Sequence, residues 1–445
     1  MSSIVQRALA AAAAAAILGG SAGAQLLPSV GLPALPPVNL PTRDLPVAGP
    51  VLRDVLSQPG AREAVAPTLD TVSGLPDRIA EAPAATLLEL RRLRLRELIR
   101  QHPRELDADG SGQPVRRGVL VVLNPDPASL QLASRGGFGV VADDRDPELG
   151  IRSVSLAVPR GLSTRDGLKR LRKIAPRLEA DFDHLYEPAG GELLPFAGTL
   201  ATSQGNAGGR RIGVVDGGVA SHPSLSGASI EQNGFAGKPQ PTGHGTAVAS
   251  LVVGNQGPFR GAARGASLFV ADVYGGSRAA GSASAIVRAL GWLASKRPQV
   301  INISLVGPQN ALMQRAVQAL RARGIQVVAA VGNDGPAAPP QYPASYPGVV
   351  AVTGVDARGR ALPEAGKALH LDFAAPGSDM AAALPGQGYA KVRGTSFAAP
   401  LATARLALSG SVQRLASEAR PGKGRVGRGI ICGDCRIEPK AVRAK

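Results

Sequence analysis

The segment Gly394–Pro400 constrains the fold more than any other stretch of this sequence. Gly394 permits backbone conformations that other residues resist, and the run rich in Ala and Leu behind Ser396 predicts a helix that ends at Gly410. A serine in the first helical turn lies among free N–H groups at the positive end of the helix dipole, where a developing oxyanion is stabilised. Ser396 is therefore a candidate nucleophile, and a serine nucleophile requires a base.

The candidate base and its partners lie upstream. His244 stands in a glycine-flanked turn that leads into an apolar helix, while Asp216 and Asn333 each end an apolar run typical of a buried strand. Because sites in open parallel sheets form beyond the carboxyl ends of the strands, we expect Asp216 and Asn333 to converge with His244.

The order Asp216, His244, Asn333, Ser396, each in its own local motif, resembles that of the subtilisin-like serine proteases (subtilases, peptidase S8), over roughly residues 205–440. The resemblance implies that Ser396 attacks a scissile carbonyl, His244 carries the proton and Asp216 orients the imidazole. It also implies that the Asn333 side chain and the Ser396 N–H bind the oxyanion. The expected substrates are proteins or peptides.

The same resemblance implies a set of substrate-binding residues: Ser304, Leu305, Val306, Gly307, Gln341 and Ala283. Val306 replaces a usual glycine, Gln341 stands where a small residue often forms the base of the S1 pocket, and Ala283 falls near a frequent aromatic of the S4 wall. We therefore expect a shallow S1, an open S4 and a preference for small or polar P1 residues.

Two further departures from the family pattern concern the residue after Asp216 and a loop that binds calcium in the family. Gly217 follows Asp216 where many subtilases carry Ser or Thr, so one hydrogen bond to the carboxylate is expected to be missing. The loop Gly254–Arg264 contains two arginines and no carboxylate, whereas calcium prefers several oxygen ligands. We expect no cofactor and no calcium at this loop, and other calcium sites stay open.

Alternating apolar and helical patterns divide the chain. Residues 1–24 are predicted to be a secretory signal peptide and 25–83 a Pro/Ala-rich segment of low order. A basic helix and linker follow over 84–112, and the catalytic domain is expected over 210–445. Its strands and helices alternate, which predicts an α/β fold with a parallel sheet covered by helices on both faces.

Residues 113–190 show the order β-α-β-β-α-β of a ferredoxin-like sandwich, with a helix over Thr164–Leu178 and a last strand over Phe182–Tyr186. By pattern and position this part resembles the prodomain that precedes many subtilase catalytic domains. It would serve as an intramolecular chaperone and inhibitor, with self-cleavage in the connector between Glu187 and Gly209, most of which is the predicted processing region 191–209. The alternative is an unrelated small domain that stays attached.

Composition narrows the remaining classes. The net charge is +17, but no aromatic residues interleave the arginines as a single-strand nucleic-acid site would require, so we expect a basic surface and no nucleic-acid partner. Cys432 and Cys435 favour a local disulfide in a secreted chain. The sequence predicts a secreted or periplasmic monomer without a membrane span after signal removal. Its rival is a catalytically silent or permanently inhibited subtilase-like peptide-binding protein.

Overall fold

The computed structural model describes residues 84–190, 192–196, 208–386 and 388–442. The predicted signal peptide and the Pro/Ala-rich segment lie outside these residues. The described residues all belong to one compact unit. Among the described residues, no helix is both long and apolar enough to cross a membrane.

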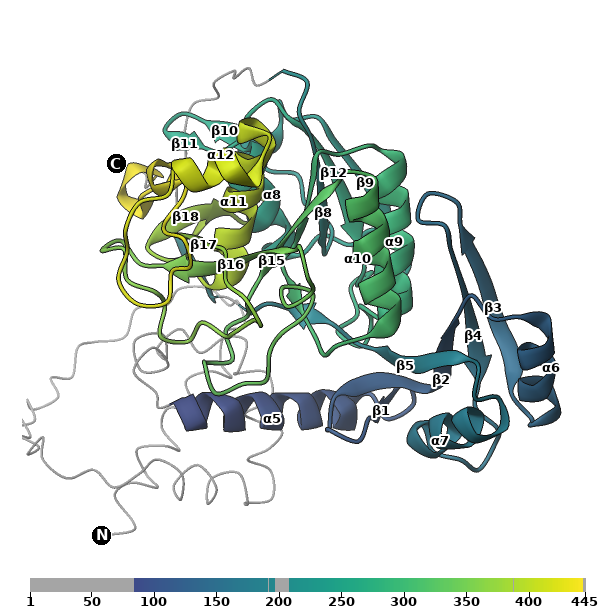
Figure 1. The fold of residues 1–445 in the computed structure, drawn as a ribbon. Coiled ribbons are helices and arrows are strands. Elements are labelled where there is room, and N and C mark those ends of the chain that lie inside the picture. Colours follow the sequence, from purple (N-terminus) through teal and green to yellow (C-terminus); the bar gives the residue numbers. More distant parts are fainter. Residues whose placement is uncertain (1–83, 191, 197–207, 387, 443–445) are drawn as a thin grey trace, which may run out of the picture. The chain divides into compact units, whose positions relative to one another are not determined.

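A parallel sheet of seven strands forms the centre of the larger part, in the order β17-β16-β15-β13-β8-β12-β9 (Figure 1). Its strands, in chain order, are β8 (Arg211–Asp216), β9 (Ile230–Gly234), β12 (Ser267–Asp272), β13 (Val300–Ile303), β15 (Gln326–Ala330), β16 (Val350–Val355) and β17 (Phe373–Pro376). Every adjacent pair runs parallel. This is the predicted α/β sheet.

Helices cover both faces of this sheet because its strands are apolar on both sides. Along β8, Ile212 and Val214 pack with α8 (Gly243–Val253) and α11 (Thr395–Ser409), whereas Val215 packs with α9 (Ala283–Ser295) and α10 (Ala311–Ala322). The period of two follows from the alternation of side chains along a strand. Trp292 of α9 is half-buried and packs against this core beside Phe235.

A smaller antiparallel sheet precedes this part, with the strand order β5-β2-β4-β3 and a short β1 beside β2. Its elements are β1 (Leu106–Ala108), β2 (Pro114–Leu123), α6 (Pro127–Arg135), β3 (Gly139–Asp146), β4 (Ile151–Ala157), α7 (Thr164–Ile174) and β5 (Glu179–His184). From β2 to β5 the order is β-α-β-β-α-β, as the sequence predicts for a ferredoxin-like sandwich. Leu120, Leu156 and Leu171 are among the residues of its own apolar core.

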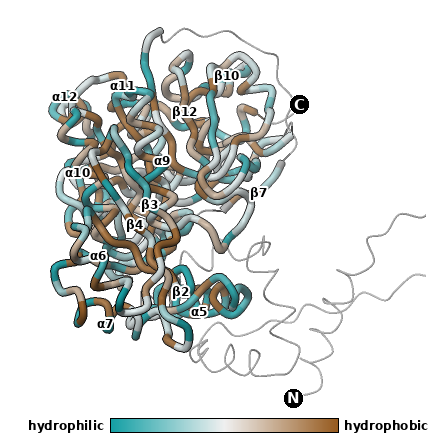
Figure 2. The backbone as a smooth tube through the Cα atoms, turned by 90° about the vertical axis from the view of Figure 1, so that its right-hand side faces the viewer, coloured by the Kyte–Doolittle hydropathy of each residue, from teal (hydrophilic) through white to brown (hydrophobic). Residues whose placement is uncertain are grey.

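Boundaries differ from prediction in two places. Helix α7 ends at Ile174 and not at Leu178, because Pro176 disfavours a helical conformation at Ala175. The last strand of the small sheet is accordingly displaced toward the N-terminus and starts at Glu179. By contrast, α5 occupies Ala84–Gln101, the range that its leucine pattern predicts; Figure 2 shows hydrophobic and hydrophilic residues mixed along it.

The connector between the two parts contains strands that sequence reasoning did not anticipate. Strand β6 (Glu187–Pro188) pairs antiparallel with β14 (Leu305–Val306), and β7 (Glu192–Phe196) pairs antiparallel with β19 (Tyr389–Arg393). The chain on both sides of residue 191 is thus bound to the larger part.

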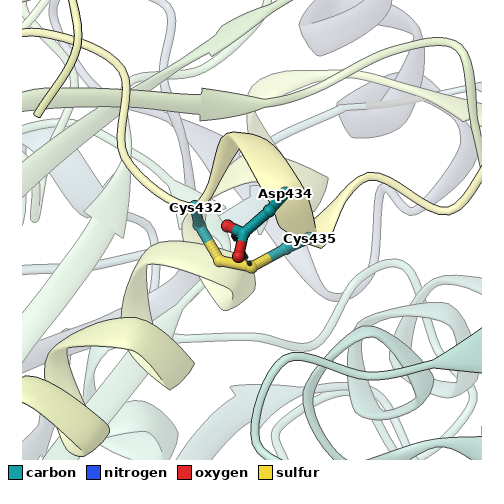
Figure 3. Close-up of side chains that lie close together, drawn as sticks. All are labelled: Cys432, Asp434 and Cys435. Carbon is teal, nitrogen blue, oxygen red and sulfur yellow. Dashed lines mark hydrogen bonds between the residues drawn. A yellow bond between two sulfur atoms is a disulfide. The ribbon is translucent and has the colours of Figure 1, made fainter. Parts of the chain in front are cut away.

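The remaining elements lie around the central sheet: β10 (Asn255–Gln256), β11 (Phe259–Arg260), β18 (Met380–Ala383), α12 (Val412–Ser417) and the 3-10 helices Pro223–Leu225, Gly433–Cys435 and Pro439–Val442. Cys432 and Cys435 form the predicted disulfide, shown with Asp434 in Figure 3. Among the described residues these three are the one group of potential ligand side chains gathered as for a metal ion. The disulfide consumes both thiols, so this group is not a thiolate metal site.

Candidate active site

Asp216 and His244 meet at the end of β8 and the start of α8. Asp216 is 1% exposed, and both of its carboxylate oxygens lie 2.9 Å from Nδ1 of His244. Because a carboxylate only accepts, Nδ1 carries the proton in this pair and the neutral ring keeps its lone pair on Nε2. That Nε2 atom is buried and has no hydrogen-bond partner among the described residues. The imidazole is therefore in the tautomer that a general base requires.

Ser396 lies in the first turn of α11, after Gly394, whose φ of 144° is in the range that favours glycine. Its hydroxyl donates to the carbonyl oxygen of Gly190 at 2.7 Å. The ring of the next residue, Phe397, lies 5.3 Å from the His244 ring, measured between centroids. The imidazole thus lies beside the helix turn that carries the serine.

Asn333 follows β15, and its side chain contacts the same Gly190 carbonyl as the Ser396 hydroxyl. Its Nδ2 atom lies 2.6 Å from the carbonyl oxygens of both Ala189 and Gly190, while its Oδ1 accepts the N–H of Thr395 at 2.9 Å. The bond to Thr395 fixes which end of the amide is the donor. An amide donor is therefore held against two consecutive carbonyls of the connector.

A buried polar chain supports the backbone of Ser396, and sequence reasoning missed part of it. Ser304 Oγ donates to the Ser396 carbonyl at 2.9 Å and accepts from Asn302 Nδ2 at 2.9 Å. Thr403 Oγ1 donates to Asn302 Oδ1 at 3.1 Å. Asn302 stands on β13 and Thr403 on α11, so the chain links sheet and helix. Two isolated polar residues inside apolar runs were the signal in the sequence.

The predicted substrate-binding segment pairs with the chain's own residues. Leu305 and Val306 lie opposite Pro188 and Glu187, and the Ala189 N–H donates to the Ser304 carbonyl at 2.8 Å. An extended peptide here makes the main-chain hydrogen bonds of an added strand. The connector thus pairs with the segment Ser304–Val306 through main-chain hydrogen bonds, as an added strand does.

Tyr186 directly precedes strand β6 and is held in place on its backbone and its ring. Its N–H donates to the Gly281 carbonyl at 2.9 Å, its side chain is fully buried, and it shares an apolar cluster with Ala283. A Cβ on Gly307 would lie 2.6 Å from the Tyr186 ring. Burial raises the pKa of the Tyr186 hydroxyl well above its ordinary value. The Tyr186 ring therefore lies against Gly307, while the Tyr186 backbone is bound to Gly281, two residues before Ala283.

The side chain of Gln341 lies close to Gly332 and Val306. Its side chain is 1% exposed, its Nε2 donates to the Pro339 carbonyl at 2.7 Å, and its Oε1 is buried without a partner among the described residues. A Cβ on Gly332 would lie 3.3 Å from Val306 Cγ1 and 3.4 Å from Gln341 Cγ. Val306 and Gln341 therefore approach each other across Gly332.

Gly217 has a steric reason that the sequence did not reveal. A Cβ at this position would lie 2.4 Å from Thr242 Oγ1, and that oxygen caps α8 by accepting the N–H of Gly245 at 2.9 Å. The Gly217 N–H donates to Asp216 Oδ1 at 2.7 Å. The carboxylate thus receives a backbone hydrogen bond from the residue whose side chain is missing.

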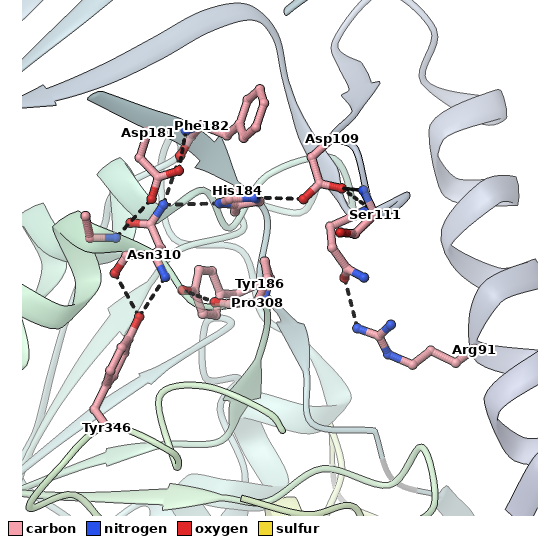
Figure 4. Close-up of polar contacts among 12 residues, drawn as sticks. Arg91, Asp109, Ser111, Asp181, Phe182, His184, Tyr186, Pro308, Asn310 and Tyr346 are labelled. Atoms are coloured by element: carbon pink, nitrogen blue, oxygen red, sulfur yellow. Dashed lines mark hydrogen bonds and ion pairs between the residues drawn. The ribbon is translucent and has the colours of Figure 1, made fainter. Parts of the chain in front are cut away.

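The small sheet is joined to the larger part by carboxylates at two helix N-termini. Asp183 accepts from the N–H and the hydroxyl of Ser284 at 2.9 and 2.7 Å, and Asp181 accepts from the N–H of Ala311 at 3.0 Å. Figure 4 shows His184 in the same network, between Asp109 and Asn310. Negative charge at a helix N-terminus is stabilised by the free N–H groups there.

A parallel sheet that brings a serine, a histidine with an acceptor nitrogen and a buried carboxylate to one edge defines a serine hydrolase. Comparison with known proteins agrees. The Subtilase family model matches residues 208–419. Subtilisin Savinase of Lederbergia lenta is 35% identical over 201 residues, which are 43% of this chain and 72% of that protein. The alkaline protease of Alkalihalobacillus alcalophilus is also 35% identical, over 51% of its length.

Among solved structures, fervidolysin from Fervidobacterium pennivorans, a keratinolytic enzyme related to subtilisin, superposes with a TM-score of 0.60 at 19% identity. The match covers 74% of this chain and 62% of fervidolysin and shows a shared fold. This chain belongs to the subtilase family of serine-type endopeptidases.

Proposed function

We propose that the chain is a secreted or periplasmic serine endopeptidase made as a zymogen, whose pro-region follows the predicted signal peptide and ends at Ala189 or Gly190. The observation that carries the proposal is the position of the Gly190 carbonyl. Its oxygen lies 2.7 Å from the Ser396 hydroxyl and 2.6 Å from the Asn333 amide nitrogen. A main-chain carbonyl between a nucleophile and an amide donor is placed as in a substrate complex.

The residues then take the following roles. The Ser396 hydroxyl turns toward the lone pair on His244 Nε2, gives up its proton and attacks the carbonyl carbon. Asp216 stabilises the imidazolium through Nδ1–H, and His244 returns the proton to the leaving amine as the C–N bond breaks. Water, activated by the same Nε2 atom, then hydrolyses the acyl-enzyme and restores the Ser396 hydroxyl. Asn333 Nδ2 and the Ser396 N–H hold the oxyanion, a contact that strengthens in the transition state.

Self-cleavage is proposed at a peptide bond of Gly190, because the carbonyls of Ala189 and Gly190 are the ones that the Asn333 amide contacts within the described part of the connector. The mature protein would then begin at Gly190 or Gly191. The small sheet, docked through Asp181 and Asp183, would be the chaperone and inhibitor. Calcium is not required by any part of this proposal.

One experiment tests the function directly. The purified chain is treated with a fluorophosphonate probe, beside a Ser396→Ala control, and its N-terminus is mapped by mass spectrometry. We expect labelling of Ser396 and a new N-terminus at residue 190 or 191. An unlabelled wild-type protein that retains its connector would favour the silent, peptide-binding alternative.

A further inference from the structure

Helix α5 precedes the small sheet and contacts the loop that carries Asn333. Arg91 Nε lies 3.0 Å from Asp334 Oδ2, and Arg94 Nη2 lies 3.0 Å from Asp334 Oδ1. Asp334 is the residue directly after Asn333. Two arginines of one helix therefore bind both carboxylate oxygens of the residue next to the oxyanion donor.

The ion pair between Arg91 and Asp334 is buried. The side chains of Arg91 and Asp334 are 7% and 8% exposed, so solvent and salt screen their pair weakly. Arg91 also donates to the Gln113 side chain at 2.9 Å and so ties the small sheet to the loop. On the same face of α5, Leu87 packs on Gly335, where a Cβ would lie 2.9 Å from its Cδ1.

Arg94 extends the contact to the peptide in the cleft. Its Nη2 atom lies 3.4 Å from Glu187 Oε2, on strand β6. Burial alone would lower the pKa of Arg94, but the carboxylates of Glu187 and Asp334 raise it above its ordinary value. The Arg94 guanidinium thus connects strand β6 to the loop that carries Asn333.

We propose that α5 is a second inhibitory element: an arginine latch in which Arg91 and Arg94 hold the loop of Asn333–Gly335 and Arg94, through Glu187, holds the connector strand beside it. This inference rests on the proposed function. The latch does not involve the bond that is cut, and Glu187 lies on the N-terminal side of that bond, so cleavage at Gly190 leaves the latch closed and the cut connector strand paired with β14. Processing and the appearance of activity are then separate steps, and opening requires a second event, such as a cut within residues 84–112.

The test uses the full chain and a matched pair of double variants. Arg91→Ala/Arg94→Ala removes the latch, whereas Arg92→Ala/Arg96→Ala removes the same charge from exposed positions of the same helix. Processing is followed by mass spectrometry and activity by hydrolysis of a small fluorogenic peptide. We expect activity to lag behind processing in the wild type and in the exposed pair, and the lag to shorten at least tenfold in the latch variant. Equal lags in the two variants would overturn the proposal.

A second measurement does not depend on proteolysis. In the Ser396→Ala chain, hydrogen exchange is compared with and without the latch arginines. We expect faster exchange in residues 84–101 and 331–336 while residues 114–184 stay protected. Unchanged exchange in residues 331–336 would refute the latch. Loss of protection throughout the small sheet would also refute it, because α5 and the small sheet would then unfold together as one unit. A wild-type chain that is neither labelled nor processed would refute the proposed function and leave this result interpretable.

Discussion

The hydroxyl of Ser396 donates to the carbonyl oxygen of Gly190 at 2.7 Å, although 206 positions separate the two residues in sequence. Gly190 has a φ of +73°, and a Cβ there would lie 3.4 Å from Asn333 Nδ2. An alanine would be strained in this conformation by about 1–2 kcal/mol. We expect Gly190→Ala to slow self-cleavage about tenfold, measured as the rate at which the full-length band disappears. Gly118→Ala is the control, because Gly118 has a φ of +67° in open space. Equal rates for the two variants would show that the cleft does not require glycine.

Removal of the Asn333 side chain tests the oxyanion site. Asn333→Ala deletes the amide nitrogen that lies 2.6 Å from the Gly190 carbonyl. We expect kcat to fall about 10²–10³-fold, which is the loss known for removal of the equivalent donor in subtilisin. KM should change little, because the contact strengthens in the transition state. Asn233→Ala, at an exposed position of β9, is the control. A change confined to KM would mean that Asn333 only binds substrate.

The central sheet and the positions of Asp216, His244 and Ser396 could be predicted because local signals specify them. Apolar runs identify the strands, and glycines mark the turns from which the polar side chains emerge. His222 shows the limit of such signals. This residue is buried, with Nδ1 2.8 Å from Ser224 Oγ and Nε2 3.0 Å from the Gly388 carbonyl. Its short segment has no periodicity that reports burial.

Contacts between distant segments could not be predicted for a different reason. Arg91 and Asp334 are 243 positions apart, and the leucine pattern of α5 shows an inner face without showing what it faces. The approach of Val306 to Gln341 across Gly332 likewise depends on how three loops pack. Such pairings follow from tertiary geometry, which the period of a single element does not contain.

Restoration of the family's serine after the carboxylate should harm this enzyme. In Gly217→Ser the new Cβ would approach within 2.4 Å of Thr242 Oγ1, and Thr242 caps the helix of His244. Loss of such a cap costs about 1 kcal/mol, so we expect a lower thermal midpoint and lower activity. Adding Thr242→Ala removes the two atoms closer than 3.0 Å. The double variant should then lose less than the sum of the single ones. Additive losses of stability and activity would show that the contact between positions 217 and 242 is not the cause.

Acid should weaken the small sheet. Burial raises the pKa of Asp109, but hydrogen bonds from His184 and from the N–H groups of Gln113 and Ser111 outweigh it, so the pKa lies below its ordinary value. A lowered pKa stabilises the fold above the ordinary value of about 4, and this contribution is lost as pH falls through the folded-state pKa. In the Ser396→Ala background, the thermal midpoint should fall less between pH 7 and pH 3 in Asp109→Asn than in its parent. Glu179→Gln, at an exposed position, is the control and should follow the parent.

The side chain of Gln341 should set the size of the preferred P1 residue. It is 1% exposed, and its Cγ and Val306 Cγ1 lie on either side of the space above Gly332. Gln341→Ala removes the amide and opens this space, so cleavage after Phe should rise relative to cleavage after Ala. A fitted hydrophobic side chain is discriminated by about 1–3 kcal/mol, which corresponds to a rise of about tenfold or more in the ratio of kcat/KM values.

The unpartnered Oε1 of Gln341 adds a second expectation to this test. A buried acceptor favours a substrate side chain that donates a hydrogen bond, so the wild type should prefer Ser or Thr over Val at P1, and Gln341→Ala should lose that preference. Profiling a peptide library with both enzymes measures both effects at once. Gln326→Ala, at the start of β15, is the control. Strong cleavage after Phe or Tyr by the wild type would show that Gln341 moves aside on binding and does not close the pocket.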